Sequence, residues 1–283
     1  MLYPLSYRGG VTTGRLRPLF TGHINQRHFL ILFLERVRKK SEIIISFRGV
    51  DMVGEMVDFE AGDATAGGYL ATPDGAGQGV MVIQEWWGLA PQIKSVCDRL
   101  AENGFVALAP DLYHGELAQH SEMDKAGELM STLPPDRAVR DMSGAIDYLL
   151  KNPNVNGGTV GVVGFCMGGM LSLLIAASEG DRIAAVAPFY GAPLGDGEPD
   201  WTDLTARVEG HFASVDDFFP PDSVAELENK LREMGKDVTF NIYPETGHAF
   251  ANEENPLGTY NPEIADVAWG RVLEMFSKEL SSN

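Results

Sequence analysis

The chain has 283 residues, of which 44% are hydrophobic and 22% charged, and its formal net charge is −18 at pH 7. This acidity argues against a nucleic acid or an anionic membrane as a partner, and no apolar run approaches the roughly 18 residues that a membrane span needs. Two cysteines, Cys97 and Cys166, are too few for a disulfide framework. We therefore expect a cytoplasmic α/β protein without membrane or nucleic-acid contacts.

The first 50 residues differ in charge from the rest of the chain. They contain nine basic and two acidic residues, which leaves 13 basic and 38 acidic residues in 51–283. The apolar run Phe29–Leu34 precedes the basic residues 36–40, whereas a secretory signal has its basic region first. A transit peptide is an alternative, but we expect residues 1–51 to be a disordered or spurious extension. The folded domain would then span residues 52–283.

Strand and helix signals alternate from residue 55 onward. Strand patterns cover residues 67–72, 79–84, 105–109, 159–163, 183–187, 207–213 and 238–243. Helical periodicity covers residues 91–103, 136–151, 167–178, 222–235 and 262–280. Several strands are continuously apolar, as expected when helices cover both faces of a sheet. The pattern predicts a doubly wound, mostly parallel sheet with helices on both faces, and a polar loop over 191–203 at the rim of its active site.

A cysteine lies between a predicted strand and a predicted helix, in the segment Gly-Phe-Cys-Met-Gly-Gly over 164–169. Gly-x-Cys-x-Gly is the pattern of the nucleophile elbow of α/β-hydrolases, with sulfur in place of the usual serine oxygen. The helix that begins at Met167 directs its N–H groups and the positive end of its dipole at Cys166, so we expect the thiolate to be favoured. Cys97 is expected to be a buried helix residue.

A cysteine nucleophile needs a base, and the base needs a residue that orients it. Two histidines follow Cys166 in the chain. His211 lies within a predicted strand and is expected to be packed there, whereas His248 follows the strand 238–243 and is the candidate base. Asp216 and Asp217 both follow the strand 207–213. We favour Asp216 as the residue that orients His248, with Asp217 as the alternative.

Glu85, Trp86 and Trp87 follow the strand 79–84. In α/β-hydrolases the turn after such an early strand supplies one backbone N–H of the oxyanion hole, and the residue after the nucleophile supplies the other. We assign these donors to Trp86 and Met167. Glu85 is expected beside the thiol rather than in solvent. The two tryptophans either line an aromatic pocket or pack beneath the rim.

Five segments of the chain resemble the dienelactone hydrolase family (carboxymethylenebutenolidases) over roughly residues 55–280. They are Gln-Glu-Trp-Trp-Gly over 84–88, Ala-Pro-Asp-Leu-Tyr over 109–113, the segment 164–169, Ser-Val-Asp over 214–216 and Gly-His-Ala-Phe over 247–250. The resemblance implies an α/β-hydrolase fold, a triad of Cys166, His248 and Asp216, and a thioester acyl-enzyme. It also implies that Glu85 contacts the resting thiol and helps to form the thiolate when substrate binds, in a monomeric enzyme without a cofactor.

The chain departs from this family at two positions. Members of the chlorocatechol pathway hold the carboxylate of the substrate with two arginines, and Gly115 and Asn252 stand at these positions here. Neither can form a charge-assisted fork with a carboxylate. The neighbouring His114 is either a weaker anion contact or an exposed loop residue. We therefore expect hydrolysis of a small ester or lactone of open identity. A thioesterase, an acyl transferase or a non-catalytic binding protein on the same scaffold are the alternatives.

Overall fold

The computed structural model describes residues 54–281. The predicted extension over 1–51 lies outside the described residues. All of the described residues belong to one compact unit, Ile45–Asn283. No helix among the described residues is both long and apolar enough to cross a bilayer.

The described residues form an eight-stranded sheet in the order β1-β2-β4-β3-β5-β6-β7-β8. The strands are β1 (Glu55–Ala61), β2 (Ala64–Ala71), β3 (Gly77–Ile83), β4 (Phe105–Pro110), β5 (Val155–Phe165), β6 (Ile183–Phe189), β7 (Arg207–Val215) and β8 (Val238–Gly247). β1 and β2 pair antiparallel and β2 joins β4 antiparallel, whereas the pairs from β4 through β8 are parallel. The mostly parallel, doubly wound sheet predicted from the sequence is therefore confirmed.

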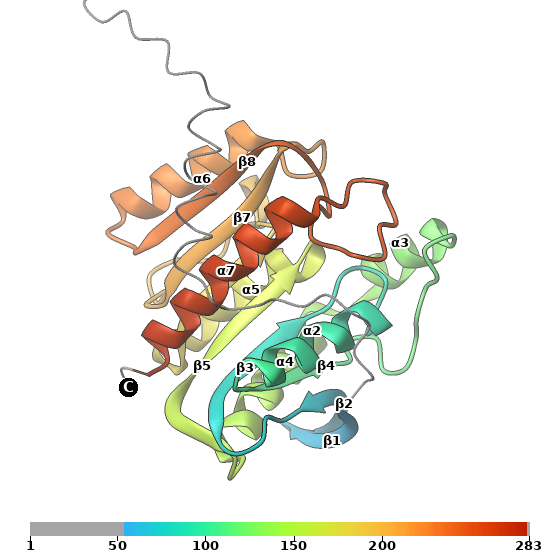
Figure 1. Ribbon diagram of the computed structural model, residues 1–283, viewed down its shortest axis with the longest axis vertical. Coiled ribbons are helices and arrows are strands. Elements are labelled where there is room, and N and C mark those ends of the chain that lie inside the picture. Colours follow the sequence, from blue (N-terminus) through green and yellow to red (C-terminus); the bar gives the residue numbers. More distant parts are fainter. Residues whose placement is uncertain (1–53, 282–283) are drawn as a thin grey trace, which may run out of the picture. The chain divides into compact units, whose positions relative to one another are not determined.

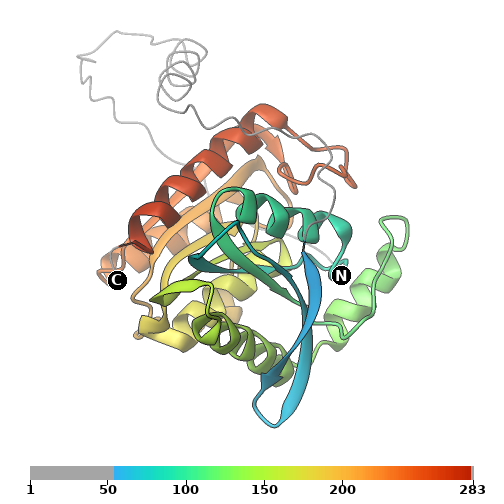
Figure 2. The same ribbon diagram turned by 60° about the horizontal axis from the view of Figure 1, so that its bottom comes forward.

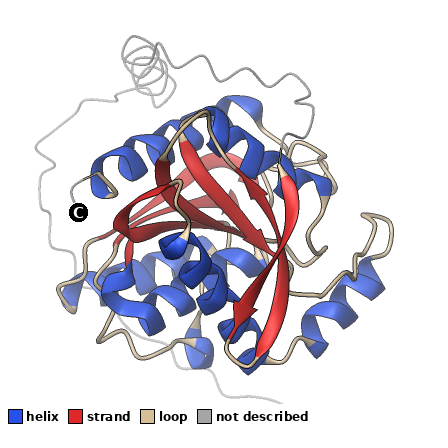
Figure 3. Cartoon of the chain, turned by 90° about the horizontal axis from the view of Figure 1, so that it is seen from below, coloured by secondary structure: helices blue, strands red, loops and turns tan. Residues whose placement is uncertain are grey.

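Helices cover both faces of the sheet (Figures 1, 2 and 3). They are α2 (Pro91–Glu102), α3 (Met123–Thr132), α4 (Pro135–Lys151), α5 (Met167–Glu179), α6 (Pro221–Glu233) and α7 (Pro262–Glu279). α2 and α7 lie on one face, and α4, α5 and α6 lie on the other (Figure 2). β4 is buried along its whole length, and β3, β5 and β6 are buried toward their C-terminal ends, because both faces of these strands pack against helices.

Local signals explain where several helices begin and end. α2, α4, α6 and α7 each begin with proline, whose fixed φ suits the first turn and whose missing N–H would have no partner there. Asn103 is the C-cap of α2 and precedes Gly104, and Met234 is the C-cap of α6 and precedes Gly235. Both glycines have positive φ, 87° and 76°, so the predicted helix stops are confirmed.

Two elements were missed by the sequence patterns. β1 is an edge strand with alternating charged and apolar residues, and it pairs only with β2. α3 projects from the connection between β4 and α4 (Figure 1), and Ala126 is its one buried residue. A helix that buries so little of its surface leaves little hydrophobic periodicity in the sequence.

Candidate active site

The parallel strands end at a common edge, and five residues of the site follow these strand ends. Cys166, Tyr190, Asp216 and His248 each come directly after the last residue of β5, β6, β7 and β8. Glu85 comes two residues after the end of β3. Because ligands in open α/β sheets bind beyond the carboxyl ends of the strands, this edge is where a catalytic site is expected.

Cys166 occupies a strained turn between β5 and α5. Its φ of 54° and ψ of −115° are unusual for a residue with a side chain and cost of the order of 1–3 kcal/mol. Its backbone N–H donates to the Phe189 carbonyl at 3.0 Å. A Cβ on Gly191 would lie 1.9 Å from the Cys166 carbonyl oxygen, so only glycine fits there. These constraints hold the sulfur at the apex of the elbow.

The elbow is also packed tightly against the end of β3. A Cβ on Gly168 would lie 2.4 Å from the Ile83 carbonyl oxygen and 2.5 Å from that of Gln84. The first turn of α5 and the segment that carries Trp86 are therefore adjacent. This adjacency places the two assigned oxyanion donors, on Trp86 and Met167, on neighbouring pieces of backbone.

Asp216 and His248 are directly hydrogen-bonded. The His248 Nδ1 lies 2.8 Å from the Asp216 Oδ2, and both side chains are buried. The other oxygen, Oδ1, accepts the backbone N–H groups of Phe218 and Phe219 at 2.9 and 3.1 Å. Asp217 is exposed. Of the two aspartates that the sequence left open, Asp216 is the one that contacts the histidine.

Three aromatic rings surround His248. The ring centroids of Phe218, Tyr190 and Phe219 lie 4.8, 5.2 and 5.8 Å from that of the imidazole. Phe219 is stacked on the imidazole at an interplanar angle of 17°, and Tyr190 meets it edge-on at 66°. With Nδ1 bonded to Asp216, these contacts fix the plane of the imidazole.

Glu85 is buried beside this group, not solvated. Its Oε1 accepts the Tyr190 hydroxyl at 3.2 Å, and its Oε2 accepts the Asn252 side-chain amide at 2.9 Å. Burial raises the pKa of Glu85 above its ordinary value, and the positive potential of His248 and the two hydrogen bonds oppose that rise. Sequence reasoning found Glu85 but missed the two residues that hold it.

The environment of Cys166 opposes the thiolate that the N-terminus of α5 was expected to favour. Burial raises the pKa of the thiol, and the negative charge of Glu85 raises it further. The Met167 backbone N–H, at the start of α5, lowers the pKa but does not outweigh burial and Glu85. The resting residue is therefore a neutral thiol, because a helix N-terminus acts weakly against the desolvation of the sulfur.

Gly115 and Asn252, which stand where the family resemblance implied arginines, lie in different surroundings. Gly115 lies in open space with a φ of 93°, and its N–H donates to Asp111 Oδ2 at 2.6 Å. Asn252 is buried against Glu85. His114 points its Nε2 at the buried Asp141 carboxylate at 2.7 Å. His114 is thus paired with a carboxylate of α4, which argues against a role for it in binding an anionic substrate.

The structure also gives the positions of four further residues: Cys97, His211, Trp86 and Trp87. Cys97 is fully buried in α2 and His211 is fully buried in β7, as expected. Burial, together with the nearby Arg271, lowers the pKa of His211 to about 3, and its Nδ1 lies 2.9 Å from the Tyr243 hydroxyl. Trp87 is buried in a small cluster with Ala118 and Ala126 beneath the rim, whereas Trp86 is only half-buried.

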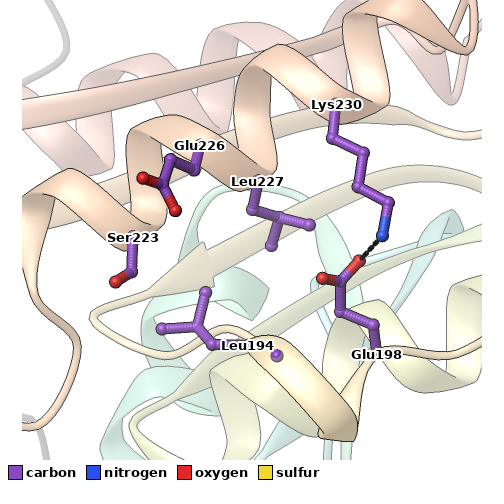
Figure 4. A pocket seen from close by; sticks show the side chains of 7 residues that line it. Leu194, Glu198, Ser223, Glu226, Leu227 and Lys230 are labelled. Atoms are coloured by element: carbon purple, nitrogen blue, oxygen red, sulfur yellow. Dashed lines mark hydrogen bonds and ion pairs between the residues drawn. The ribbon is translucent and has the colours of Figure 1, made fainter.

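A shallow pocket of about 310 Å³ lies between α6 and the loop that follows β6 (Figure 4). A hydrogen-bonded ion pair between Glu198 and Lys230, 2.7 Å apart, spans it. None of the predicted site residues lines this pocket. The lining residues are Leu194, Gly195, Glu198, Ser223, Glu226, Leu227 and Lys230.

Comparisons with known proteins agree with this architecture. The family model described as "Dienelactone hydrolase family" matches residues 66–280. "Protein usf" of Aquifex pyrophilus is 37% identical over 235 residues, covering 81% of this chain and all of that protein. A protein of Aquifex aeolicus named "Putative carboxymethylenebutenolidase" is 34% identical over 239 residues, with the same coverage.

A solved structure from Klebsiella pneumoniae, described as a "Putative Dienelactone Hydrolase", superposes with a TM-score of 0.69 at 26% identity. The superposition covers 80% of this chain and 99% of that one. The family match extends from β2 to the end of α7 and includes all the residues of the site. The chain belongs to the dienelactone hydrolase family, and it is a carboxylic ester hydrolase with the α/β-hydrolase fold.

Proposed function

We propose that the protein hydrolyses a small ester or lactone through a triad of Cys166, His248 and Asp216 and a thioester acyl-enzyme. One observation carries the proposal. Asp216 holds the Nδ1 of His248 at 2.8 Å beyond the end of β7, and Cys166 stands in a strained elbow at the same edge of the sheet. This arrangement fits the geometric roles of nucleophile, base and orienting acid.

In the first half of the reaction, the thiol proton passes to the Nε2 of His248 while the sulfur attacks the carbonyl carbon. The electron pair of the C=O bond moves to the oxygen, which accepts the backbone N–H groups of Trp86 and Met167. Two such donors are worth a few kcal/mol each to the transition state (about 3 kcal/mol). When the tetrahedral intermediate collapses, the C–O bond breaks and His248 protonates the leaving oxygen.

In the second half, water attacks the thioester carbonyl and gives a proton to His248. The C–S bond then breaks, and His248 returns that proton to the sulfur, which restores the thiol of Cys166. Asp216 stabilises the imidazolium that forms twice in this sequence. The family resemblance implies that Glu85 helps the removal of the thiol proton when substrate binds, and its burial beside Cys166 supports that role.

Cys166→Ala tests this mechanism with p-nitrophenyl acetate as substrate. We expect turnover to fall by at least about a thousand-fold, since the nucleophile is lost. Cys97→Ala is the matched control, because it removes the buried thiol of α2 and should retain turnover. Mass spectrometry after rapid quenching should find an acetyl group on the peptide that contains Cys166. Full activity of Cys166→Ala would refute the mechanism.

Cys166→Ser is a finer test of the same site. Serine keeps the geometry of the elbow, but its hydroxyl is far less acidic than a thiol. Burial and the charge of Glu85 already oppose an anion at this position in the resting site, so we expect the serine variant to be acylated slowly. Turnover close to that of the original enzyme would show that the activation step has been misassigned.

A further inference from the structure

An exposed apolar pair flanks the candidate acid. Val215 and Phe218 are 69% and 61% exposed, whereas most large apolar side chains of the described residues are buried. A single exposed apolar residue on a protein surface needs no explanation. These two, however, lie on either side of Asp216, at the edge of the sheet that carries the site.

Phe218 is in contact with the imidazole itself. Its ring centroid lies 4.8 Å from that of His248. The other two rings around His248 are more covered, since Tyr190 is fully buried and Phe219 is half-buried. Phe218 is therefore the member of this group that offers a large apolar surface to an incoming molecule while touching the residue that moves the proton.

The orientation of His248 also indicates which part of the substrate lies near Phe218. Asp216 occupies the Nδ1 of His248, which leaves Nε2 for the reacting atoms. In the proposed reaction Nε2 gives its proton to the leaving oxygen. A group bonded to that oxygen is hence the part of the substrate that lies closest to the rings around His248.

The charge of the surrounding segment favours an uncharged group. Residues 214–222 contain three aspartates and no lysine or arginine. Asn252, which stands where the family resemblance implied an arginine, is already bonded to Glu85. An apolar ring contact beside several carboxylates stabilises a neutral aryl or alkyl group and disfavours a carboxylate.

We propose that Phe218 is a specificity-determining residue that binds an apolar, uncharged group on the alcohol side of the substrate. The substrate class is then a neutral ester of an aryl-bearing or alkyl-bearing alcohol, or a lactone with an apolar substituent beside its ring oxygen. This assignment rests on the proposed function, because it uses the direction of proton transfer from His248.

The test compares benzyl acetate with methyl acetate, whose leaving alcohols have similar acidity. We expect Phe218→Ala to lower the benzyl-to-methyl ratio of kcat/KM about five-fold, the size of one aromatic contact. Phe218→Leu keeps an apolar side chain and should preserve most of the ratio. Met234→Ala removes another exposed apolar side chain, at the far end of α6, and should leave the ratio unchanged.

Phe218→Arg adds a test of charge. It should raise kcat/KM for 4-carboxybenzyl acetate relative to benzyl acetate, since a cation would then face the substrate carboxylate. Circular dichroism of each variant checks the fold. An unchanged ratio in Phe218→Ala, with turnover that still depends on Cys166, would overturn this inference alone. Turnover that persists in Cys166→Ala would instead overturn the proposed function.

Discussion

Asn252→Asp is the most direct test of how the buried carboxylate of Glu85 is held. The change keeps the size of the side chain and the Oδ1 atom that accepts the Glu254 N–H at 3.0 Å. It replaces the amide that donates to Glu85 Oε2 at 2.9 Å with a second carboxyl oxygen. Two buried carboxyl groups in contact cannot both ionise cheaply, so the pair retains one proton.

The cost depends on pH. Holding a proton at pH 8 on a carboxyl of ordinary pKa about 4 costs about 1.4 kcal/mol per pH unit, up to about 5 kcal/mol. Leaving both groups ionised about 4 Å apart costs about 4 kcal/mol at the effective dielectric constant of about 20 that describes protein sites. A carboxyl whose pKa is raised on folding binds more protons in the native state, so the free energy of unfolding falls as pH rises. We expect a loss of about 4 kcal/mol at pH 8 and about 1–2 kcal/mol at pH 5.

Urea denaturation of both proteins at pH 5, 6, 7 and 8 measures this difference. Asn241→Asp is the matched control, because Asn241 also donates to a carboxylate, that of Glu209, at 3.2 Å. Arg271 and Arg207 lie near Glu209 and Asn241 is half-buried, so the control should lose less than about 1 kcal/mol. A loss in Asn252→Asp that does not change with pH, or that the control matches, would refute the reasoning.

Two further predictions concern the acid and the start of the domain. Asp216→Asn should lower kcat by about a thousand-fold or more because an amide cannot stabilise the imidazolium. Asp217→Asn, at an exposed position, should change kcat by less than about two-fold. Steady-state kinetics on p-nitrophenyl acetate measures both variants, and equal losses would contradict the choice of Asp216 over Asp217. A chain that begins at residue 52 should fold and turn over like the full chain. A chain that begins at residue 56 should have a free energy of unfolding about 1–3 kcal/mol lower in urea denaturation, because it lacks the Gly54 N–H that donates to the buried Asp98 at 3.1 Å. Equal stability of the two shortened chains would contradict this expectation.

The fold and the position of Cys166 in a turn between a strand and a helix could be predicted because their signals are local. A glycine-flanked cysteine between an apolar strand and a helix is visible within six residues, and the inner strands are marked by continuous apolar runs. The same holds for His248, which directly follows β8. α3 was missed because it buries little apolar surface and so has no strong helical period. β1 was missed because its alternation of apolar and charged residues covers only residues 57–61.

The contacts that set the charge of the site could not be predicted from local residue patterns. Tyr190 and Asn252 contact Glu85 across 105 and 167 residues of chain, and no local pattern connects them. The N-terminus of α5 is visible in the sequence and suggested a thiolate at Cys166. The burial of the sulfur and the charge of Glu85 depend on how separate loops close over the sheet edge, and they decide the opposite outcome.

In the turn after β7, main-chain groups hold Asp216 and side chains contact His248, so different atoms make the two sets of contacts. Asp216 is anchored by the main-chain N–H groups of Phe218 and Phe219, and any amino acid other than proline supplies such a group. The side chains at those two positions are thus free to vary without releasing the acid. Natural variation or directed evolution could therefore change what this enzyme accepts by substitutions at 218 and 219 while Asp216 keeps both of its main-chain hydrogen bonds.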